Sequence, residues 1–250
     1  MQTKTEMISK NQIKYIRQLE LKKFRKREKC FVAEGPKVVG DLMRQYQPKA
    51  VFATNEWNHG DKILVTDEEL RRISFLQNPQ QVLALFPIPE PPSSILHSTS
   101  VLALALDGVQ DPGNLGTIIR IADWFGIDTI YCSEDTADAY NPKVVQATMG
   151  SLAHVHILYT DLNQLFNTLP KDYPIYGTLL DGSDIYQQPL SKHGIIVMGN
   201  EGNGISHAVR QRVTRRLLIP NFHQGDCAES LNVAIATAIT CSEFRRRDIK

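Results

Sequence analysis

The chain has 250 residues, and its 42% hydrophobic content is enough to build the core of one large domain or two small ones. No apolar run approaches the roughly 18 residues that a membrane-spanning helix needs, and the N-terminus has no signal-peptide apolar region. The four cysteines are scattered without a CxxC pair, which is typical of reduced thiols. We therefore expect a cytoplasmic protein.

Charge is unevenly distributed along the chain, although the formal net charge is only +1. Residues 1–30 hold ten Lys and Arg residues against three acids, a balance of +7 that leaves −6 for the remainder. A basic end on a slightly acidic body indicates contact with a polyanion such as nucleic acid. The alternative is an ordinary solvated helix face, and charge alone supports the two equally.

The first part of the chain predicts alternating short helices and strands. Ser9 or Asn11 can cap a helix that runs to about residue 29. A second helix is expected over residues 37–46, and a third starts at Thr66 or Asp67. The expected strands are the short apolar runs 31–33, 50–53, 63–65 and 81–86. Together these elements indicate a small α/β domain.

A proline-rich stretch over residues 87–98 interrupts this pattern. Four of its first six residues are prolines, which makes it a stiff, extended linker. We therefore expect a first domain over residues 1–86 and a second over residues 99–250. The second opens with the continuous apolar run 101–106, as expected for a parallel strand that is buried on both faces.

The second domain continues with strands and helices in alternation. A glycine-rich loop follows at residues 107–116, and a helix is expected from Thr117 to about Phe125. Further strands are expected at 129–132, 154–158, 175–180, 194–198 and 217–220. Further helices are expected at 141–150, at 162–169 and from Ser230 onward. This alternation predicts an α/β fold with a mostly parallel sheet and helices on both faces.

The clearest ligand-site signal is the stretch G-N-E-G-N-G at residues 199–204, directly after the apolar strand 194–198. Glycine permits positive φ angles and lets a ligand approach the backbone closely. Loops beyond the carboxyl ends of parallel strands are where α/β proteins bind ligands. We therefore expect a ligand site at this loop.

The sequence disfavours a dinucleotide-binding site and a metal site. The region 102–134 imitates a dinucleotide-binding unit, but Gly113 and Gly116 give G-x-x-G and lack the G-x-G start. His223, Asp226 and Cys227 lie close together, but one His and one Cys do not make a metal site. We expect neither a nicotinamide or flavin cofactor nor a metal.

Three stretches, taken together, resemble the SpoU (TrmH-like) branch of the SPOUT RNA methyltransferases. Residues 114–120, N-L-G-T-I-I-R, match that family's N-x-G-x-x-x-R. Residues 198–204 read M-G-N-E-G-N-G, and an Ile-Pro pair at 219–220 is followed by S-L-N-V-A at 230–234. The resemblance covers residues 101–250. Residues 1–86 are similar to the ribosomal-protein-L30e-like substrate domain that many members carry.

The resemblance implies a C-terminal domain tied as a trefoil knot and a homodimer built through that domain. It implies S-adenosylmethionine as the methyl donor and a ribose 2′-hydroxyl of structured RNA as the acceptor, with ribosomal RNA favoured over transfer RNA. The alternative is a non-catalytic RNA-binding protein that kept the fold. The intact set of motif residues favours the enzyme.

Four residues are implied as contacts of the donor's adenine: Gly199, Leu218, Ile219 and Leu231. Gly199 is the expected residue type there, because a Cβ would keep a ligand away from the backbone. The other three are expected to supply backbone groups and apolar surface.

Five residues are implied as catalytic: Asn114, Arg120, Glu201, Ser230 and Asn232. The Arg120 guanidinium suits a phosphate or the reacting ribose, but it is a poor proton acceptor, so we expect positioning and charge stabilisation. Asn114 orders the glycine loop or contacts the substrate. Glu201 orients Arg120 or a ribose, or caps the next helix. Ser230 and Asn232 can bond the reacting hydroxyl, and Ser230 is also a natural N-cap.

Overall fold

The computed structural model describes residues 8–90, 101–223, 225 and 228–247. The chain forms two compact units, which we call the N-terminal unit (Met1–Glu90 with Asp138–Ala153) and the C-terminal unit (Pro91–Ala137 with His154–Lys250). The grouping of residues 138–153 with the first unit was not expected from the sequence. Most of the linker expected over residues 87–98 lies outside the described residues.

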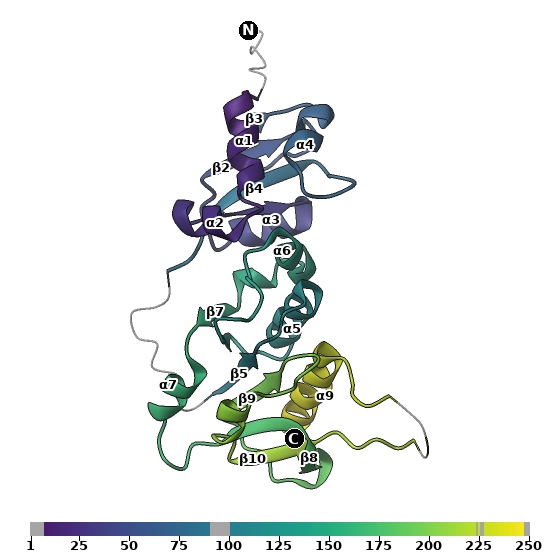
Figure 1. The fold of residues 1–250 in the computed structure, drawn as a ribbon. Helices are drawn as coiled ribbons and strands as arrows, with labels where there is room; N and C mark the ends of the chain where they lie inside the picture. The colour runs from purple at the N-terminus through teal and green to yellow at the C-terminus, as the bar shows by residue number, and fades with distance from the viewer. Residues whose placement is uncertain (1–7, 91–100, 224, 226–227, 248–250) are drawn as a thin grey trace. The chain divides into compact units, whose positions relative to one another are not determined.

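The N-terminal unit is built on a four-stranded mixed sheet in the order β1-β4-β2-β3 (Figure 1). Its strands are β1 (Cys30–Glu34), β2 (Ala50–Ala53), β3 (Ile63–Leu64) and β4 (Val82–Pro87). Its helices are α1 (Lys10–Gln18), α2 (Lys22–Glu28), α3 (Pro36–Met43), α4 (Asp67–Ile73), α6 (Pro142–Thr148) and the 3₁₀ turn η1 (Ser151–Ala153). β4 pairs antiparallel with both β1 and β2, while β2 and β3 are parallel.

The single helix expected up to residue 29 is wrong, because the chain breaks into α1 and α2. Ser9 caps α1 in a capping box with Gln12, so of the two predicted caps Ser9 is the one used. The break is stabilised by Arg25, which is 1% exposed. Its guanidinium donates to the carbonyls of Leu19 (2.7 Å) and Glu20 (2.6 Å) at the end of α1. A buried side chain thus satisfies carbonyls that a continuous helix would have paired internally.

Arg25 also forms a salt bridge with Asp138, with Nε and Nη2 donating to one carboxylate oxygen at 3.0 and 2.5 Å. This pair ties segment 138–153 to the helical part of the N-terminal unit. The ring of Phe31 on β1 contacts the Tyr140 ring in a tilted arrangement, at a centroid distance of 5.0 Å. One of the ten cations of the basic N-terminal stretch is therefore structural.

The C-terminal unit is built on a six-stranded, fully parallel sheet in the order β10-β8-β9-β5-β6-β7 (Figure 1). Its strands are β5 (Leu102–Asp107), β6 (Thr129–Cys132), β7 (His156–Tyr159), β8 (Ile175–Asp184), β9 (Gly194–Gly199) and β10 (Arg215–Leu218). Its helices are α5 (Pro112–Trp124), α7 (Leu162–Asn167), α8 (His207–Arg210), α9 (Val233–Arg246) and the 3₁₀ turn η2 (Ile185–Gln187). The predicted parallel α/β architecture is confirmed.

Helices cover both faces of this sheet. On one face, Ala103 of β5 and Val197 of β9 belong to a core cluster with residues of α7 and α8, such as Phe166. On the other, the Tyr176 ring of β8 meets Phe244 of α9 edge-on at 4.8 Å, and α9 packs along α5. Because successive side chains of a strand point to opposite faces, the continuous apolar strands fill both layers.

Two helix starts differ from expectation in ways that matter for the site. α5 begins at Pro112 with Asp111 as its N-cap, so the predicted glycine loop is partly helical and Asn114 lies in the first helical turn. α9 begins at Val233, and its N-cap is Asn232 rather than Ser230. In both cases the side-chain cap is an Asx residue just before the helix.

Strand β8 makes an excursion out of its ladder with β10. Arg216 pairs with Gly177, but the next residue, Leu217, pairs with Ser183, so residues 178–182, which we call the β8 excursion, pair with no residue of β10. The chain returns at Gly182, where a Cβ would lie only 2.4 Å from the Leu217 carbonyl carbon. Glycine therefore permits the close backbone approach at which the excursion rejoins β10.

Candidate functional site

A cavity of about 810 Å³ opens at the carboxyl ends of β9 and β10. Its walls are the β8 excursion, the loop after β9, and the segment that follows β10 up to the start of α9. Cavities of this size accommodate small organic ligands and cofactors. The position agrees with the rule that open parallel sheets bind ligands beyond their carboxyl ends.

The four predicted donor contacts, Gly199, Leu218, Ile219 and Leu231, all line this cavity. They come from two strand ends and from the segment before α9, and they combine apolar side chains with backbone at the ends of strands. This chemistry fits a flat, apolar ring with hydrogen-bonding edges. The structure brings these residues together, and their contact with a donor stays a prediction.

Gly199 is required by the fold of its own loop. A Cβ there would lie 2.2 Å from the Gly204 carbonyl carbon and 2.3 Å from the Ile205 nitrogen. The loop closes just beyond it, where Asn200 and Gly204 exchange two backbone hydrogen bonds of 2.9 Å. A side chain at position 199 would therefore clash with the protein's own backbone, where the loop returns over Gly199, in addition to displacing a ligand.

Asn200 is a site residue that the sequence reasoning missed. Its Oδ1 accepts from the backbone nitrogens of Gly202 and Asn203, both at 2.9 Å, and its Nδ2 donates to the Gly108 carbonyl at 2.7 Å. The side chain thus shapes the loop and fastens it to the loop after β5. An Asn in a glycine-rich loop is typical of such self-bonded turns, and that signal was available.

Three predicted catalytic residues from distant parts of the chain form one hydrogen-bonded network. Asn232 Nδ2 donates to Asn114 Oδ1 at 2.9 Å, and Asn114 Nδ2 donates to Glu201 Oε1 at 3.0 Å. Each residue belongs to a different one of the three sequence motifs. The network therefore joins the start of α5, the loop after β9 and the start of α9.

The orientation of both amides follows from the helix that Asn232 caps. Its Oδ1 accepts from the backbone nitrogens of Ala234 and Ile235, at 2.9 and 3.3 Å, so its Nδ2 must face Asn114. Asn114 then presents Oδ1 to Asn232 and Nδ2 to Glu201. Each amide keeps at most one further N–H for a ligand, because each Nδ2 carries two hydrogens.

Glu201 accepts hydrogen bonds from three N–H groups. Besides Asn114, the donors are the backbone nitrogens of Gln110 and Asp111, each at 3.2 Å. Partial burial raises the pKa of Glu201, but the hydrogen bonds from Asn114 and from the backbone outweigh it and lower the pKa below its ordinary value. A carboxylate stabilised in this way is a poor general base.

Within one chain Glu201 contacts neither Arg120 nor the start of the next helix, and its contact with a ribose stays a prediction. It holds the approach to α5, which lies before it in the chain, rather than capping the next helix, α8. Among the residues that the structure describes, it forms no ion pair with Arg120. Its role within one chain is to fix the Asn114 amide and the loop that leads to it.

Arg120 lies apart from this network, on the exposed side of α5. It does not line the cavity, and within the described part of the chain its guanidinium makes no hydrogen bond or ion pair. The same side of α5 carries Thr117, which is exposed, and Trp124, which is 84% exposed. Ser230, by contrast, is exposed and lines the cavity with Leu231.

Comparison with known proteins identifies the family. The sequence pattern of the SpoU rRNA Methylase family matches residues 101–242, which is more than half of the chain. The chain belongs to this family. Residues 10–84 match a second pattern, the MRM3-like substrate binding domain. The resemblance drawn from the three motifs is thus confirmed.

Relatives of this SpoU family member cover nearly its full length. The 23S rRNA (guanosine(2553)-2′-O)-methyltransferase RlmP of Bacillus subtilis is 31% identical over 95% of this chain and 97% of its own. A solved TrmH-family structure from Porphyromonas gingivalis is 42% identical, with a TM-score of 0.86 over 96% of this chain and 99% of that one. An AdoMet-bound rRNA methyltransferase from Sinorhizobium meliloti is 31% identical, with a TM-score of 0.86 over 98% and 99%.

Proposed function

We propose that this chain transfers a methyl group from S-adenosylmethionine to a ribose 2′-hydroxyl of ribosomal RNA. The observation that carries the proposal is the network of Asn114, Glu201 and Asn232, which joins the three family motifs beside a cofactor-sized cavity. The relative from Bacillus subtilis supports 23S rRNA as the substrate, and the Sinorhizobium meliloti structure supports the donor.

S-adenosylmethionine, when bound, supplies an electrophilic methyl group on a sulfonium centre. Gly199, Leu218, Ile219 and Leu231 would hold its adenine end, since they line the cavity at the strand ends. Closure of the loop between Asn200 and Gly204 makes that wall a fixed surface. A preformed wall lowers the entropic cost of binding.

The acceptor hydroxyl needs to be positioned, and its proton passes to solvent water when the methyl group is transferred. Ser230 lines the cavity, and its hydroxyl can both accept and donate a hydrogen bond. Asn114 and Asn232 can each donate one remaining N–H, but their oxygens are already engaged by protein donors. Arg120 supplies positive charge and suits a phosphate, and its exposure leaves it open to RNA. We assign the first three to positioning the ribose and Arg120 to charge stabilisation.

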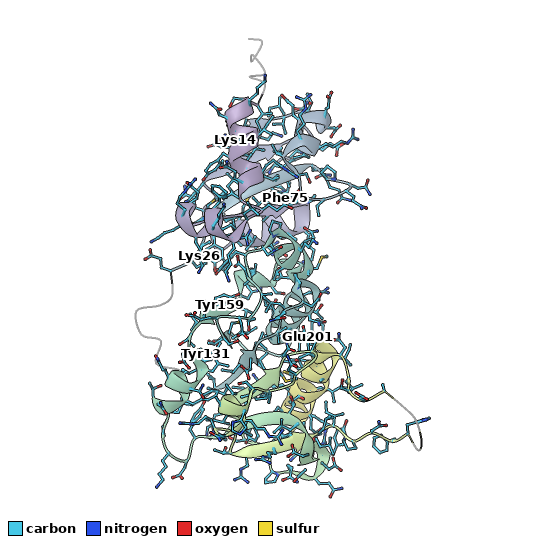
Figure 2. The ribbon with its side chains drawn as sticks, viewed as in Figure 1. Lys14, Lys26, Phe75, Tyr131, Tyr159 and Glu201 are labelled. Atoms are coloured by element: carbon cyan, nitrogen blue, oxygen red, sulfur yellow. The ribbon has the colours of Figure 1, made fainter. Side chains whose placement is uncertain are left out.

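The basic surface of α1 and α2 is proposed to contact the RNA. Lys14 and Lys26 are exposed on these helices (Figure 2). Two cations lie over the Phe24 ring, with Lys23 Nζ 5.2 Å and the Arg27 guanidinium 4.8 Å from its centroid. Cations beside an aromatic ring can bind a phosphate and a stacked base together. The match to a substrate-binding domain over residues 10–84 supports this role.

We further propose a cytoplasmic homodimer formed through the C-terminal unit. The exposed Trp124 of α5 and Ile235 of α9, two large apolar side chains on helices that pack together, support an interface there. Cys30, Cys132 and Cys241 are free and buried, in keeping with a reducing compartment. Among the described residues, no helix is both long and apolar enough to cross a membrane. The trefoil knot stays a prediction.

The test measures donor binding and methyl transfer separately. Calorimetry is expected to show binding of S-adenosylmethionine, and radiolabelled donor is expected to mark an unmodified 23S rRNA transcript but not a DNA copy of it, which lacks the acceptor. The labelled position is expected to resist alkaline cleavage, since a methylated 2′-oxygen cannot attack the adjacent phosphate. RNA binding without donor binding or transfer would instead identify a non-catalytic RNA-binding protein.

A further inference from the structure

Two arginines share one carboxylate at the edge of the cavity. Asp181, in the β8 excursion, pairs through the same oxygen with Arg210 of α8 and with Arg216 of β10, the latter at 3.1 Å. Asp181 and Arg210 line the cavity. The side chains remain open to solvent, with exposed fractions of 48% for Asp181, 37% for Arg210 and 50% for Arg216.

The charge at this place is not balanced. Residues 210–216 contain four arginines and no acid. A single carboxylate neutralises one of the two guanidinium groups that it touches, which leaves one positive charge at this group, while the carboxylates of Glu201 and Glu229 line other parts of the cavity. An exposed pair of this kind contributes little to stability, so holding the fold is a weak explanation for it.

An unusually exposed aromatic side chain lies on another wall of the same cavity. Phe222 is 86% exposed and stands in the segment after β10. Exposed aromatic rings beside cationic side chains are the common means of holding single-stranded RNA, because a base stacks on the ring while the cations bind its phosphate.

We propose that Arg210, Arg216 and Phe222 form a docking site for a nucleotide adjacent to the one that is methylated. The arginines bind its phosphate, and its base stacks on Phe222. Asp181 holds the two guanidinium groups side by side before RNA binds. The inference rests on the proposed RNA methyl transfer and adds a substrate contact in the C-terminal unit, separate from the basic helices of the N-terminal unit.

The competing occupant is the carboxylate of the methyl donor, because Arg210 lines the cavity that the donor would enter. The exposure of Arg216 and Phe222 favours a larger ligand that arrives from solvent. Measuring donor affinity and RNA affinity on the same variants shows whether the arginines bind the donor carboxylate or an RNA phosphate.

The experiment uses the full chain, S-adenosylmethionine and an unmodified 23S rRNA transcript. Arg216→Gln and Phe222→Ala are each expected to weaken RNA binding at least about fivefold, with unchanged donor affinity. For Arg216→Gln, the dependence of log affinity on log salt is expected to become less steep by about 0.7. Asp181→Asn is expected to tighten RNA binding, because it removes an anion beside the phosphate.

Two matched controls lie outside the proposed site. Arg215→Gln removes the same charge from the neighbouring position on β10, whose side chain points to the opposite face of the sheet. Tyr186→Ala removes an exposed aromatic ring that does not line the cavity. Both are expected to keep RNA affinity within twofold of the unmodified chain.

Equal losses in Arg215→Gln and Arg216→Gln would overturn the docking site and leave only a general charge effect. Loss of donor affinity in Arg216→Gln would overturn it in favour of a donor contact. If the unmodified chain methylates RNA while Arg216→Gln and Phe222→Ala behave like it, this inference fails and the proposed function stands. If the unmodified chain transfers no methyl group, the proposed function itself fails.

Discussion

The two units use their polar side chains in opposite ways. In the C-terminal unit, Asn114, Glu201 and Asn232 bond to one another and to the backbone, so their positions are fixed before any ligand arrives. In the N-terminal unit, cations such as Lys14 and Lys26 face solvent. Chemistry at a reacting atom needs fixed geometry, whereas contact with an RNA backbone needs charge that can adapt. The C-terminal unit thus holds side chains whose positions are fixed by hydrogen bonds, and the N-terminal unit holds exposed charges suited to attract RNA.

Each unit also contains an exception. Arg25 lies among the surface cations of the N-terminal unit but is buried against Asp138. Arg120 belongs to a motif of the C-terminal unit but lies outside its network, on the exposed side of α5. Substitutions of Arg25 and Arg120 therefore test this difference between the two units most directly.

The largest expected effect is that of Arg120→Ala on methyl transfer. Because we propose that the Arg120 charge stabilises the reacting RNA, its loss is expected to lower kcat by about 10²–10³-fold. The free energy of unfolding is expected to change by no more than about 0.5 kcal/mol, because the side chain is exposed. Single-turnover kinetics and urea unfolding measure the two quantities. A loss of stability without a loss of rate would place Arg120 among structural residues.

A smaller effect, on stability rather than rate, is expected from Arg25→Ala. Removing one partner of a buried pair is expected to cost about 3 kcal/mol of unfolding free energy. Lys26→Ala is the matched control, and it is expected to change stability by less than about 0.5 kcal/mol while weakening RNA binding. Trp57 is buried in the N-terminal unit, so its fluorescence reports the unfolding of that unit. Equal stability of the two variants would contradict the structural role of Arg25.

Two substitutions of Asn232 separate its cap from its link to Asn114. Asn232→Asp keeps an oxygen for the α9 N-terminus but has no N–H for Asn114 Oδ1, so methyl transfer is expected to fall about tenfold with little change in stability. Asn232→Ala loses both contacts and is expected to cost about 1 kcal/mol of stability as well. Unfolding midpoints and rates on the same RNA give the comparison. Identical behaviour of the two variants would mean that the link to Asn114 has no effect of its own.

The smallest expected effect is the pH dependence that Glu201 gives to stability. Because the fold lowers the pKa of Glu201, its contribution is fully present above the ordinary Glu pKa of about 4.3 and is lost as the pH falls through the lowered value. Glu201→Gln is expected to cost no more than about 1 kcal/mol at neutral pH, and less as the solution is acidified. Urea unfolding from pH 7 down to about pH 3.5 measures this. A difference that grew on acidification would show that the carboxylate is not stabilised in the fold.

The sequence by itself determined the elements whose causes are local. The continuous apolar run at 101–106 specified a buried parallel strand, and Thr66 with Glu69 formed the capping box that starts α4. The three motifs also specified the family, because they are read in order along the chain. Side-chain alternation and capping act over a few residues, so a single sequence displays them.

Only the tertiary structure decided which groups those elements bring together. The break between α1 and α2 depends on Arg25 meeting Asp138, which lies 113 positions further along the chain. Glu201 meets Asn114 across 87 positions, and Asn232 meets it across 118. The order of the strands in the sheet creates these contacts, and no local pattern records that order. For this reason the sequence supplied the candidate residues, while the fold joined Glu201 to Asn114 and left Arg120 exposed to solvent.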